Sequence, residues 1–361
     1  MSKSPRSLRI AAALLACAGG GALFALMHTP LPWMMGSMLA MAAVQMAGAG
    51  LEPLPGGRNA GMMVVGVSLG LYFTAPIVHE VATYWPWFIA LGLAAVGFGA
   101  ASGLVLARLS GVDRATAYFG SMPGGASEMA VMGEPYGARP DRVALAHSVR
   151  MLFVVTVFPI GITVAGFSAT DDYHAVITPF DPKGLAELFA IALVAGTIAR
   201  LIRLPTAYMM GPLVATIVLT VWGVKFSSVP IPLTNVAQVL LGCALGARFD
   251  GTFLRTAPRF AAALVPSILL MLVLAASVGA LLAWGSGVYL GSGLLAAAPG
   301  GIAEMSITAK VLRIGVAFVT AAHVVRYIVV VFLTVPVYRL LAHVRGRSLF
   351  RGNREIGKPL E

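Results

Sequence analysis

The stretch that decides the fold is PGGASEM at residues 123–129, because the chain repeats it as PGGIAEM at residues 299–305. Each copy lies in an apolar segment and carries a glutamate at the same position, Glu128 in the first and Glu304 in the second. Proline has no N–H group and glycine accepts unusual dihedral angles, so the motif predicts an interrupted helix. A carboxylate beside an interrupted apolar helix indicates a site within a membrane rather than a soluble core.

The residues that follow each copy also match. HSVRMLFVV begins at His147 and HVVRYIVVV begins at His323, so each half continues into an apolar helix with histidine and arginine on one face. The further echoes pair LPWMMG with LPTAYMMG, beginning at Leu31 and Leu204, and NAGMMVVGVSLG with NVAQVLLGCALG, beginning at Asn59 and Asn235. Because the echoes occur in the same order, the pattern indicates duplication of a whole half of the chain.

Composition predicts a membrane protein. Of 361 residues, 58% are hydrophobic and 11% are charged, and the mean hydropathy is +0.88. So little charge cannot cover the surface of a soluble domain, and the chain contains repeated apolar runs of about 20 residues. A net charge of +11 would suggest nucleic acid as a partner of a soluble protein. Here the basic residues flank apolar runs, which favours orientation anchors beside anionic lipid and no direct contact with nucleic acid.

We therefore expect an all-α polytopic membrane protein with two homologous halves, each with five spans and one re-entrant or broken PGG segment. The repeats cover residues 1–168 and 184–342, with a polar connector at 169–183 and a basic tail at 343–361. The distribution of basic loops favours an inverted repeat with both termini in the cytoplasm over twelve spans in parallel repeats. The expected location is the bacterial inner membrane, with lipid as the surrounding partner. The sequence leaves homo-oligomerisation open.

The first PGG segment predicts two half-helices, at residues 115–122 and 126–133, each about 12 Å long. Half-helices of this length suit a break inside the bilayer, although a proline-kinked continuous span is the alternative. Ser127 and Glu128 would lie in the first turn of the second half-helix, where free N–H groups favour an anion. The second copy has Ala303 at the place of Ser127, so the two sites are not chemically equivalent.

Glutamate and arginine provide the candidate chemistry. Glu128 and Glu304 should be protonated, paired or facing water, because a carboxylate is costly in hydrocarbon. Arg150 and Arg326 lie deep in their helices, where each could hold an anionic group or pair with the glutamate of its own half. A packing role is favoured for the two histidines and a helix-capping role for the two asparagines. The candidate substrate- or ion-binding residues are Glu128, Glu304, Arg150, Arg326, Ser127, His147, His323, Gly124, Gly125, Gly300, Gly301, Asn59 and Asn235.

Other chemistries have little support in the sequence. Cys17 and Cys243 lie in separate apolar runs and do not form a zinc or disulfide pattern. The six histidines are scattered, and neither a phosphate-binding loop nor a Ser/His/Asp arrangement is present. We therefore expect no enzyme activity, no metal and no cofactor.

The duplicated PGG-x-x-EM block, the LP-x-MMG-type turns and the HxxR helices resemble the membrane AbrB-duplication family of bacterial proteins. The resemblance extends over about residues 8–341. Members carry labels such as regulator of gene expression or ammonia monooxygenase, and the family supplies no catalytic residues that could be transferred. The family's general appearance is similar to that of secondary transporters built from two inverted halves.

The leading prediction is secondary transport of a small anionic solute coupled to protons or sodium. In this interpretation Glu128 and Glu304 bind the coupling ion, and the PGG glycines let backbone line the path. Arg150 and Arg326 hold either the anion or the charge of the empty state. The alternative is a membrane-embedded regulator of gene expression that acts through partners.

Overall fold

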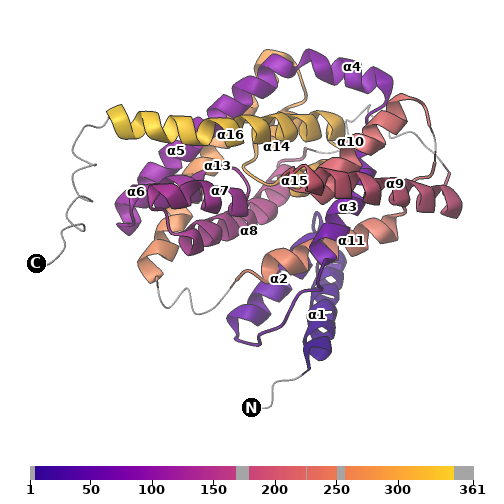
Figure 1. Cartoon of the computed structure of the whole chain (residues 1–361), viewed down its shortest axis with the longest axis horizontal. Coiled ribbons are helices and arrows are strands. Elements are labelled where there is room, and N and C mark those ends of the chain that lie inside the picture. Colours follow the sequence, from indigo (N-terminus) through magenta and orange to yellow (C-terminus); the bar gives the residue numbers. More distant parts are fainter. Residues whose placement is uncertain (1–4, 168–178, 225, 250–256, 345–361) are drawn as a thin grey trace, which may run out of the picture.

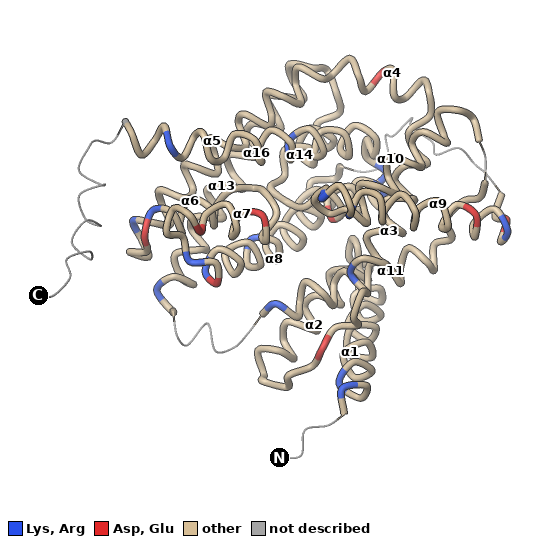
Figure 2. Tube along the Cα trace, in the orientation of Figure 1, with Lys and Arg blue, Asp and Glu red and all other residues tan. Residues whose placement is uncertain are grey.

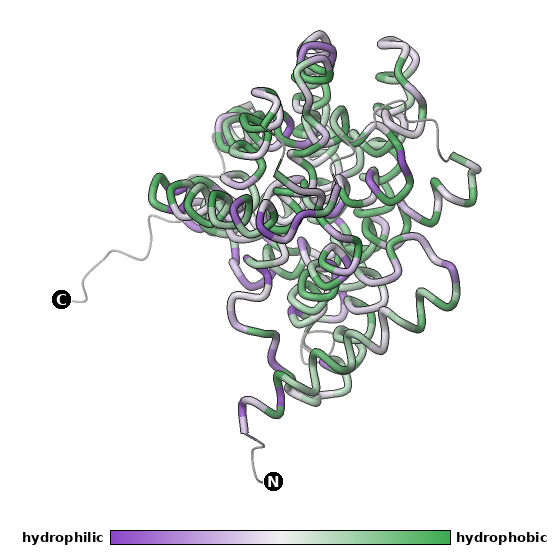
Figure 3. The backbone as a smooth tube through the Cα atoms, turned by 90° about the vertical axis from the view of Figure 1, so that its right-hand side faces the viewer, coloured by the Kyte–Doolittle hydropathy of each residue, from purple (hydrophilic) through white to green (hydrophobic). Residues whose placement is uncertain are grey.

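The computed structural model describes residues 5–167, 179–224, 226–249 and 257–344, and within these ranges it contains helices but no strands (Figure 1). Charged residues lie mainly near helix ends and in the connecting segments (Figure 2). The helices themselves are largely hydrophobic along their length (Figure 3). The predicted connector at 169–183 and tail at 343–361 lie mostly outside the described residues.

The helices follow the order predicted for a duplicated chain. The first half contains α1 (Arg6–Leu26), α2 (Pro32–Met46), α3 (Gly57–Gly70), α4 (Ala75–Thr83), α5 (Trp85–Ser110), α6 (Arg114–Ser121), α7 (Ala126–Gly133), the short η1 (Glu134–Tyr136) and α8 (Pro140–Val164). The second half contains α9 (Pro182–Leu201), α10 (Ala207–Val221), α11 (Ile231–Gly246), α13 (Pro258–Ser286), α14 (Leu290–Ala297), α15 (Ile302–Leu312) and α16 (Val316–Val344). Each apolar segment expected from the sequence is therefore helical.

Six of these helices are long and apolar enough to cross a membrane, or seven spans if the bent pair α3 and α4 counts as one. The six are α1, α5, α8, α9, α13 and α16. In contrast, α2, α3, α10 and α11 have only 14 to 16 residues, or about 21–24 Å of helix at 1.5 Å per residue. These helices are shorter than the hydrocarbon core of a bilayer, which is roughly 30 Å thick. The expected total of ten spans therefore stays a prediction.

The sequence did not indicate α4. It is bent by 92° relative to α3, and its faces differ, with Ile77 and Val81 buried and His79 and Glu80 exposed. Pro76 stands in its first turn, where the missing N–H group costs no helical hydrogen bond. Because the helix is short and one-sided, it suits the surface of the helical bundle rather than its interior.

Packing sorts the helices into two groups, which we call the frame (α1, α2, α3, α9, α10 and α11) and the core (α5 to α8 and α13 to α16). In the frame the helices lie side by side in the order α1, α2, α11, α3, α10, α9, so each half contributes helices to both sides (Figure 1). Gly242 and Gly246 of α11 contact α2, and the equivalent Gly66 and Gly70 of α3 contact α10. The duplicated glycines thus produce two equivalent close helix contacts between the halves.

Equivalent helices of the two halves lie against each other in the core. Trp87 near the start of α5 contacts Gly285 near the end of α13. At the opposite end, Arg259 Nε donates a hydrogen bond of 3.0 Å to the Leu109 carbonyl oxygen. These two contacts make α5 and α13 antiparallel, although they occupy the same place in their halves.

The frame contains a second meeting point of equivalent residues. Gly61 of α3 and Ala237 of α11 occupy the same position in their repeats. The two helices approach so closely there that a Cβ at Gly61 would lie 2.9 Å from the Ala237 carbonyl oxygen. Contact between equivalent residues is what a two-fold relation between the halves produces at its axis.

Candidate functional site

Both PGG motifs interrupt their helices. The first half-helix, α6, ends at Ser121 and α7 begins at Ala126. Between them the backbone of Met122 is extended, with ψ of 134°. The second copy behaves in the same way, because α14 ends at Ala297 and α15 begins at Ile302. The interruption predicted from proline and glycine is therefore present in both halves.

The two ends of each interrupted segment lie next to each other, so each segment turns back on itself. The backbone N–H of Arg139, next to the start of α8, donates a 2.8 Å hydrogen bond to Thr116 Oγ1 in the first turn of α6. Asp113 caps this same turn by accepting from the Thr116 N–H at 2.7 Å. In the second half the equivalent residues Gly315 and Ser292 are in contact. We therefore call residues 113–139 and 289–315 hairpin one and hairpin two.

A buried arginine holds the open backbone of hairpin one. Arg150 of α8 donates from Nη1 to the carbonyl oxygen of Met122 at 2.6 Å and from Nη2 to that of Gly124 at 3.2 Å. These carbonyls have lost their helical partners because the helix stops at this point. The guanidinium fork therefore satisfies two acceptors that the break exposes.

Hairpin two repeats this arrangement atom for atom. Arg326 of α16 donates from Nη1 to the Ala298 carbonyl oxygen and from Nη2 to that of Gly300 at 2.7 Å. The side chains of both arginines are almost fully buried, with 3% of Arg150 and 2% of Arg326 exposed. In the described part of the chain neither pairs with a carboxylate. The ion pair with the glutamate of the same half, which the sequence left open, is not formed.

The two histidines support the same breaks. His147 Nε2 lies 3.0 Å from the Phe119 carbonyl oxygen, and His323 Nε2 lies 3.0 Å from that of Leu295. A carbonyl oxygen only accepts, so Nε2 carries the proton in both histidines. In His147, Nδ1 then accepts from Arg150 Nη2 at 3.2 Å. The packing role favoured by the sequence agrees with these contacts.

The glutamates fold back over the glycine that precedes their half-helix. Oε2 of Glu128 lies where a Cβ at Gly125 would be, and Oε2 of Glu304 lies in the same way over Gly301. A glutamate three residues after the N-cap commonly reaches back in this manner, because the free N–H groups attract its carboxylate. Glu304 is only 4% exposed, whereas Glu128 is half-buried. The two equivalent carboxylates therefore differ in access to solvent.

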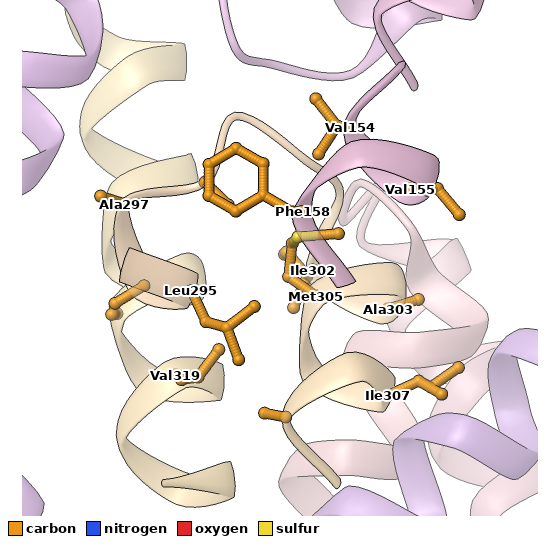
Figure 4. Packing of buried hydrophobic residues seen from close by; sticks show 14 of the residues in the cluster. Val154, Val155, Phe158, Leu295, Ala297, Ile302, Ala303, Met305, Ile307 and Val319 are labelled. Atoms are coloured by element: carbon orange, nitrogen blue, oxygen red, sulfur yellow. The ribbon is translucent and has the colours of Figure 1, made fainter. Parts of the chain in front are cut away.

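Apolar packing explains the burial of Glu304. Figure 4 shows Phe158 of α8 beside Ile302 and Met305, which flank Glu304 on α15. Met151 of α8 also lies against Gly301. The last helix of the first half thus covers the break in the second half. In hairpin one, Tyr327 of α16 interacts with Glu128. The tip of hairpin one is nevertheless more open, because Ser127 is exposed whereas the equivalent Ala303 is buried.

Two arginines at the ends of frame helices, where basic residues are expected as orientation anchors, interact with the carboxylates. Arg248, just after α11, interacts electrostatically with Glu304, Glu128 and Arg58, and Glu304 also interacts with Arg58. Partial loss of hydration and the nearby Arg58 lower the pKa of the Arg248 guanidinium, although its side chain is exposed. The structure brings Glu128 and Glu304 within range of one guanidinium.

Lys310 adds a further cation between frame and core. Its Nζ on α15 donates to Ser68 Oγ on α3 and lies 5.9 Å from the ring centre of Tyr72. The contact explains its position, because the ammonium group is held by α3 rather than by the end of its own helix.

The asparagines do not cap helices. Asn59 lies within α3, whose N-cap is Gly56, and Asn235 lies within α11, whose N-cap is Pro230. The capping interpretation is wrong, because each helix begins upstream of its asparagine. Asn59 is exposed and Asn235 is half-buried, and no described contact joins either residue to the glutamates.

These features define a class: a duplicated, all-helical protein with the helices of a multi-pass membrane protein and two arginine-held broken hairpins. The chain belongs to the AbrB family, since residues 33–342 match the family described as transition state regulatory protein AbrB. The predicted family resemblance is confirmed.

Two relatives extend the similarity over most of the chain. The uncharacterized protein YhjN of Bacillus subtilis (strain 168) is 26% identical over 364 aligned residues, which cover 92% of each chain. A protein of Escherichia coli (strain K12), named as a proposed regulator, AbrB, is 29% identical over 312 residues, which cover 84% of this chain and 88% of that one.

Proposed function

We propose that this protein is a secondary transporter of a small anionic solute, coupled to protons or sodium. The observation that carries the proposal is that Glu128 and Glu304, from two equivalent broken hairpins, both interact electrostatically with the guanidinium of Arg248. Paired broken helices at matching places in two halves are typical of transporter sites. Carboxylates in such a place can take a cation and change charge with occupancy.

Placed in a bilayer, the chain would form an inverted repeat with re-entrant hairpins. The antiparallel packing of α5 and α13 supports this arrangement, because equivalent helices of parallel repeats would point the same way. The return of each hairpin to its starting level supports re-entry rather than crossing. The basic residues that flank the spans would place both termini on the cytoplasmic side of a bacterial inner membrane.

The division into frame and core suggests how access could alternate. Both hairpins belong to the core, and α3 and α11, which carry or precede the facing arginines, belong to the frame. Each group packs mainly within itself, so a shift of one against the other disturbs few contacts. Such a movement would carry the carboxylates relative to Arg58 and Arg248.

The test is flux in reconstituted vesicles that contain the full chain and an internal pH-sensitive dye. Salts of small carboxylates and of phosphate serve as probes, with protons or sodium as the driving ion. We expect flux that Glu128→Gln abolishes while the protein remains folded, and that Asp141→Asn, a change of an exposed carboxylate, leaves intact. The alternative function is a membrane-embedded regulator, which the name of the E. coli relative favours. Effects on gene expression that persist in Glu128→Gln, with no flux for any probe, would support the regulator instead.

A further inference from the structure

Two cationic side chains of the frame, Arg58 and Arg248, interact with the hairpin glutamates of the core. Arg58 lies in the first turn of α3, and Arg248 follows the end of α11. The helices α3 and α11 cross at Gly61 and Ala237, which brings the start of one near the end of the other. On the core side, the Lys310 contact with Ser68 ties α15 to α3. The two arginines therefore face the part of the core that carries Glu304.

In the part of the chain that the structure describes, neither Arg58 nor Arg248 forms a direct ion pair with a carboxylate. Within the described ranges, the ion pairs are Arg6 and Arg9 with Glu52, and Arg139 with Asp141. Arg58 and Arg248 interact with the glutamates only at longer range, and they repel each other. Two like charges held near each other repel, and an anion bound between them would offset that repulsion.

The deeper arginines are not available for this task. The terminal nitrogens of Arg150 and Arg326 already donate hydrogen bonds to backbone carbonyls at the breaks, and both side chains are nearly fully buried. Displacing them to bind a solute would remove donors from those carbonyls, which costs about 1–3 kcal/mol for each carbonyl left unpaired. Arg248, in contrast, is exposed and Arg58 is half-buried, so a solute can reach both from solution.

We propose that Arg58 and Arg248 bind the anionic group of the solute, an oxyanion such as a carboxylate or phosphate, while Glu128 and Glu304 take the coupling cation. This inference rests on the proposed transport function and assigns its specificity to the frame. The planar fork of a guanidinium matches two oxygens of a carboxylate or phosphate. An anion between the two arginines also relieves their mutual repulsion. The site then has an anion-binding side on the frame and a cation-binding side on the core.

Binding can be tested without any measurement of transport. The purified full chain in detergent is unfolded thermally with sodium succinate or sodium phosphate, against sodium chloride at equal ionic strength. We expect at least one oxyanion to raise the Tm by several degrees at saturation, because a ligand that binds only the folded state stabilises it. Arg58→Gln and Arg248→Gln should lose the shift. Arg108→Gln, which removes an exposed arginine of α5, should retain it.

The outcomes separate this inference from the proposed function. A shift that persists in both Arg58→Gln and Arg248→Gln overturns the anion site, even if vesicles show flux. The absence of a shift with every probe in the unaltered protein overturns it as well. A shift that both substitutions remove, in a protein without flux, supports the anion site and argues against transport. If a glutamine variant fails to fold, the lysine variant at the same position should fold and require a higher probe concentration, because an ammonium cannot bind two oxygens as a fork.

Discussion

Arg150 of α8 donates a 2.6 Å hydrogen bond to the carbonyl oxygen of Met122, the residue at which the first PGG helix stops. Its counterpart in the second half makes the same contact. An arginine that looks like a ligand-binding charge in the sequence is therefore a clamp on backbone. This contact keeps the break open in a defined shape, and the glutamates are positioned by that shape.

Removal of the clamp should destabilise the protein. Arg150→Met removes the arginine donor from the carbonyls of Met122 and Gly124, although the Met122 carbonyl still accepts from the Gly124 N–H. Arg326→Met removes the arginine donor from the carbonyls of Ala298 and Gly300. We expect a loss of about 1–3 kcal/mol of unfolding free energy for each carbonyl left unpaired. Chemical unfolding in detergent micelles measures the effect. Arg108→Met is the matched control, because Arg108 is exposed near the end of α5. A loss in the clamp variants no larger than that of the control would contradict the assigned role.

The contact between Glu304 and Gly301 can be tested with a double-mutant cycle. Gly301→Ala places a Cβ where Oε2 of Glu304 lies, so the carboxylate must leave the helix start and the protein should become less stable. In a Glu304→Ala background the same Gly301→Ala change should cost little, because the obstructing group is absent. Equal losses in both backgrounds would show that the two residues do not interact. Gly19→Ala is the control for the substitution itself, since nothing lies within 4 Å of a Cβ at Gly19.

The two cysteines provide a test of the frame that needs no engineered residues. Cys17 of α1 and Cys243 of α11 come from different halves and pack together in one buried cluster. Oxidation with a small permeant oxidant should therefore form a bond between them. The measurement is maleimide labelling of the denatured protein. The oxidised protein should not be labelled unless a reductant is added first. Cys17→Ser should accept one label under either condition. Full labelling of the oxidised native chain would mean that α1 and α11 are not adjacent.

Helix positions and the breaks could be predicted from sequence because they depend on local chemistry. Pro123 removes an N–H group and the neighbouring glycines free the backbone, so the interruption follows wherever the chain folds. The role of Arg150 could not be predicted in this way, because its acceptors are backbone carbonyls that the sequence does not distinguish. Arg58 and Arg248 were missed for a related reason. Basic residues at helix ends are typical orientation anchors, and only the crossing of α3 and α11 turns these two toward the glutamates.

The inequality of the two sites was predicted, but for a different reason. Replacement of Ser127 by Ala303 suggested a chemical difference between the copies. The larger difference is burial, because α8 covers the break of hairpin two through Phe158. Such a contact joins parts of the chain that are distant in sequence and leaves no local signal.

The central claim is that the halves are inverted and that the hairpins approach from opposite sides of the membrane. The most direct measurement is labelling of intact cells with a membrane-impermeant maleimide. The target is a single cysteine, Glu134→Cys or Arg313→Cys, in a chain whose own two cysteines are serine. Both positions are exposed at the return end of a hairpin. We predict that Arg313→Cys is labelled from outside, whereas Glu134→Cys is labelled only after permeabilisation. Labelling of both positions from the same side would contradict the inverted arrangement.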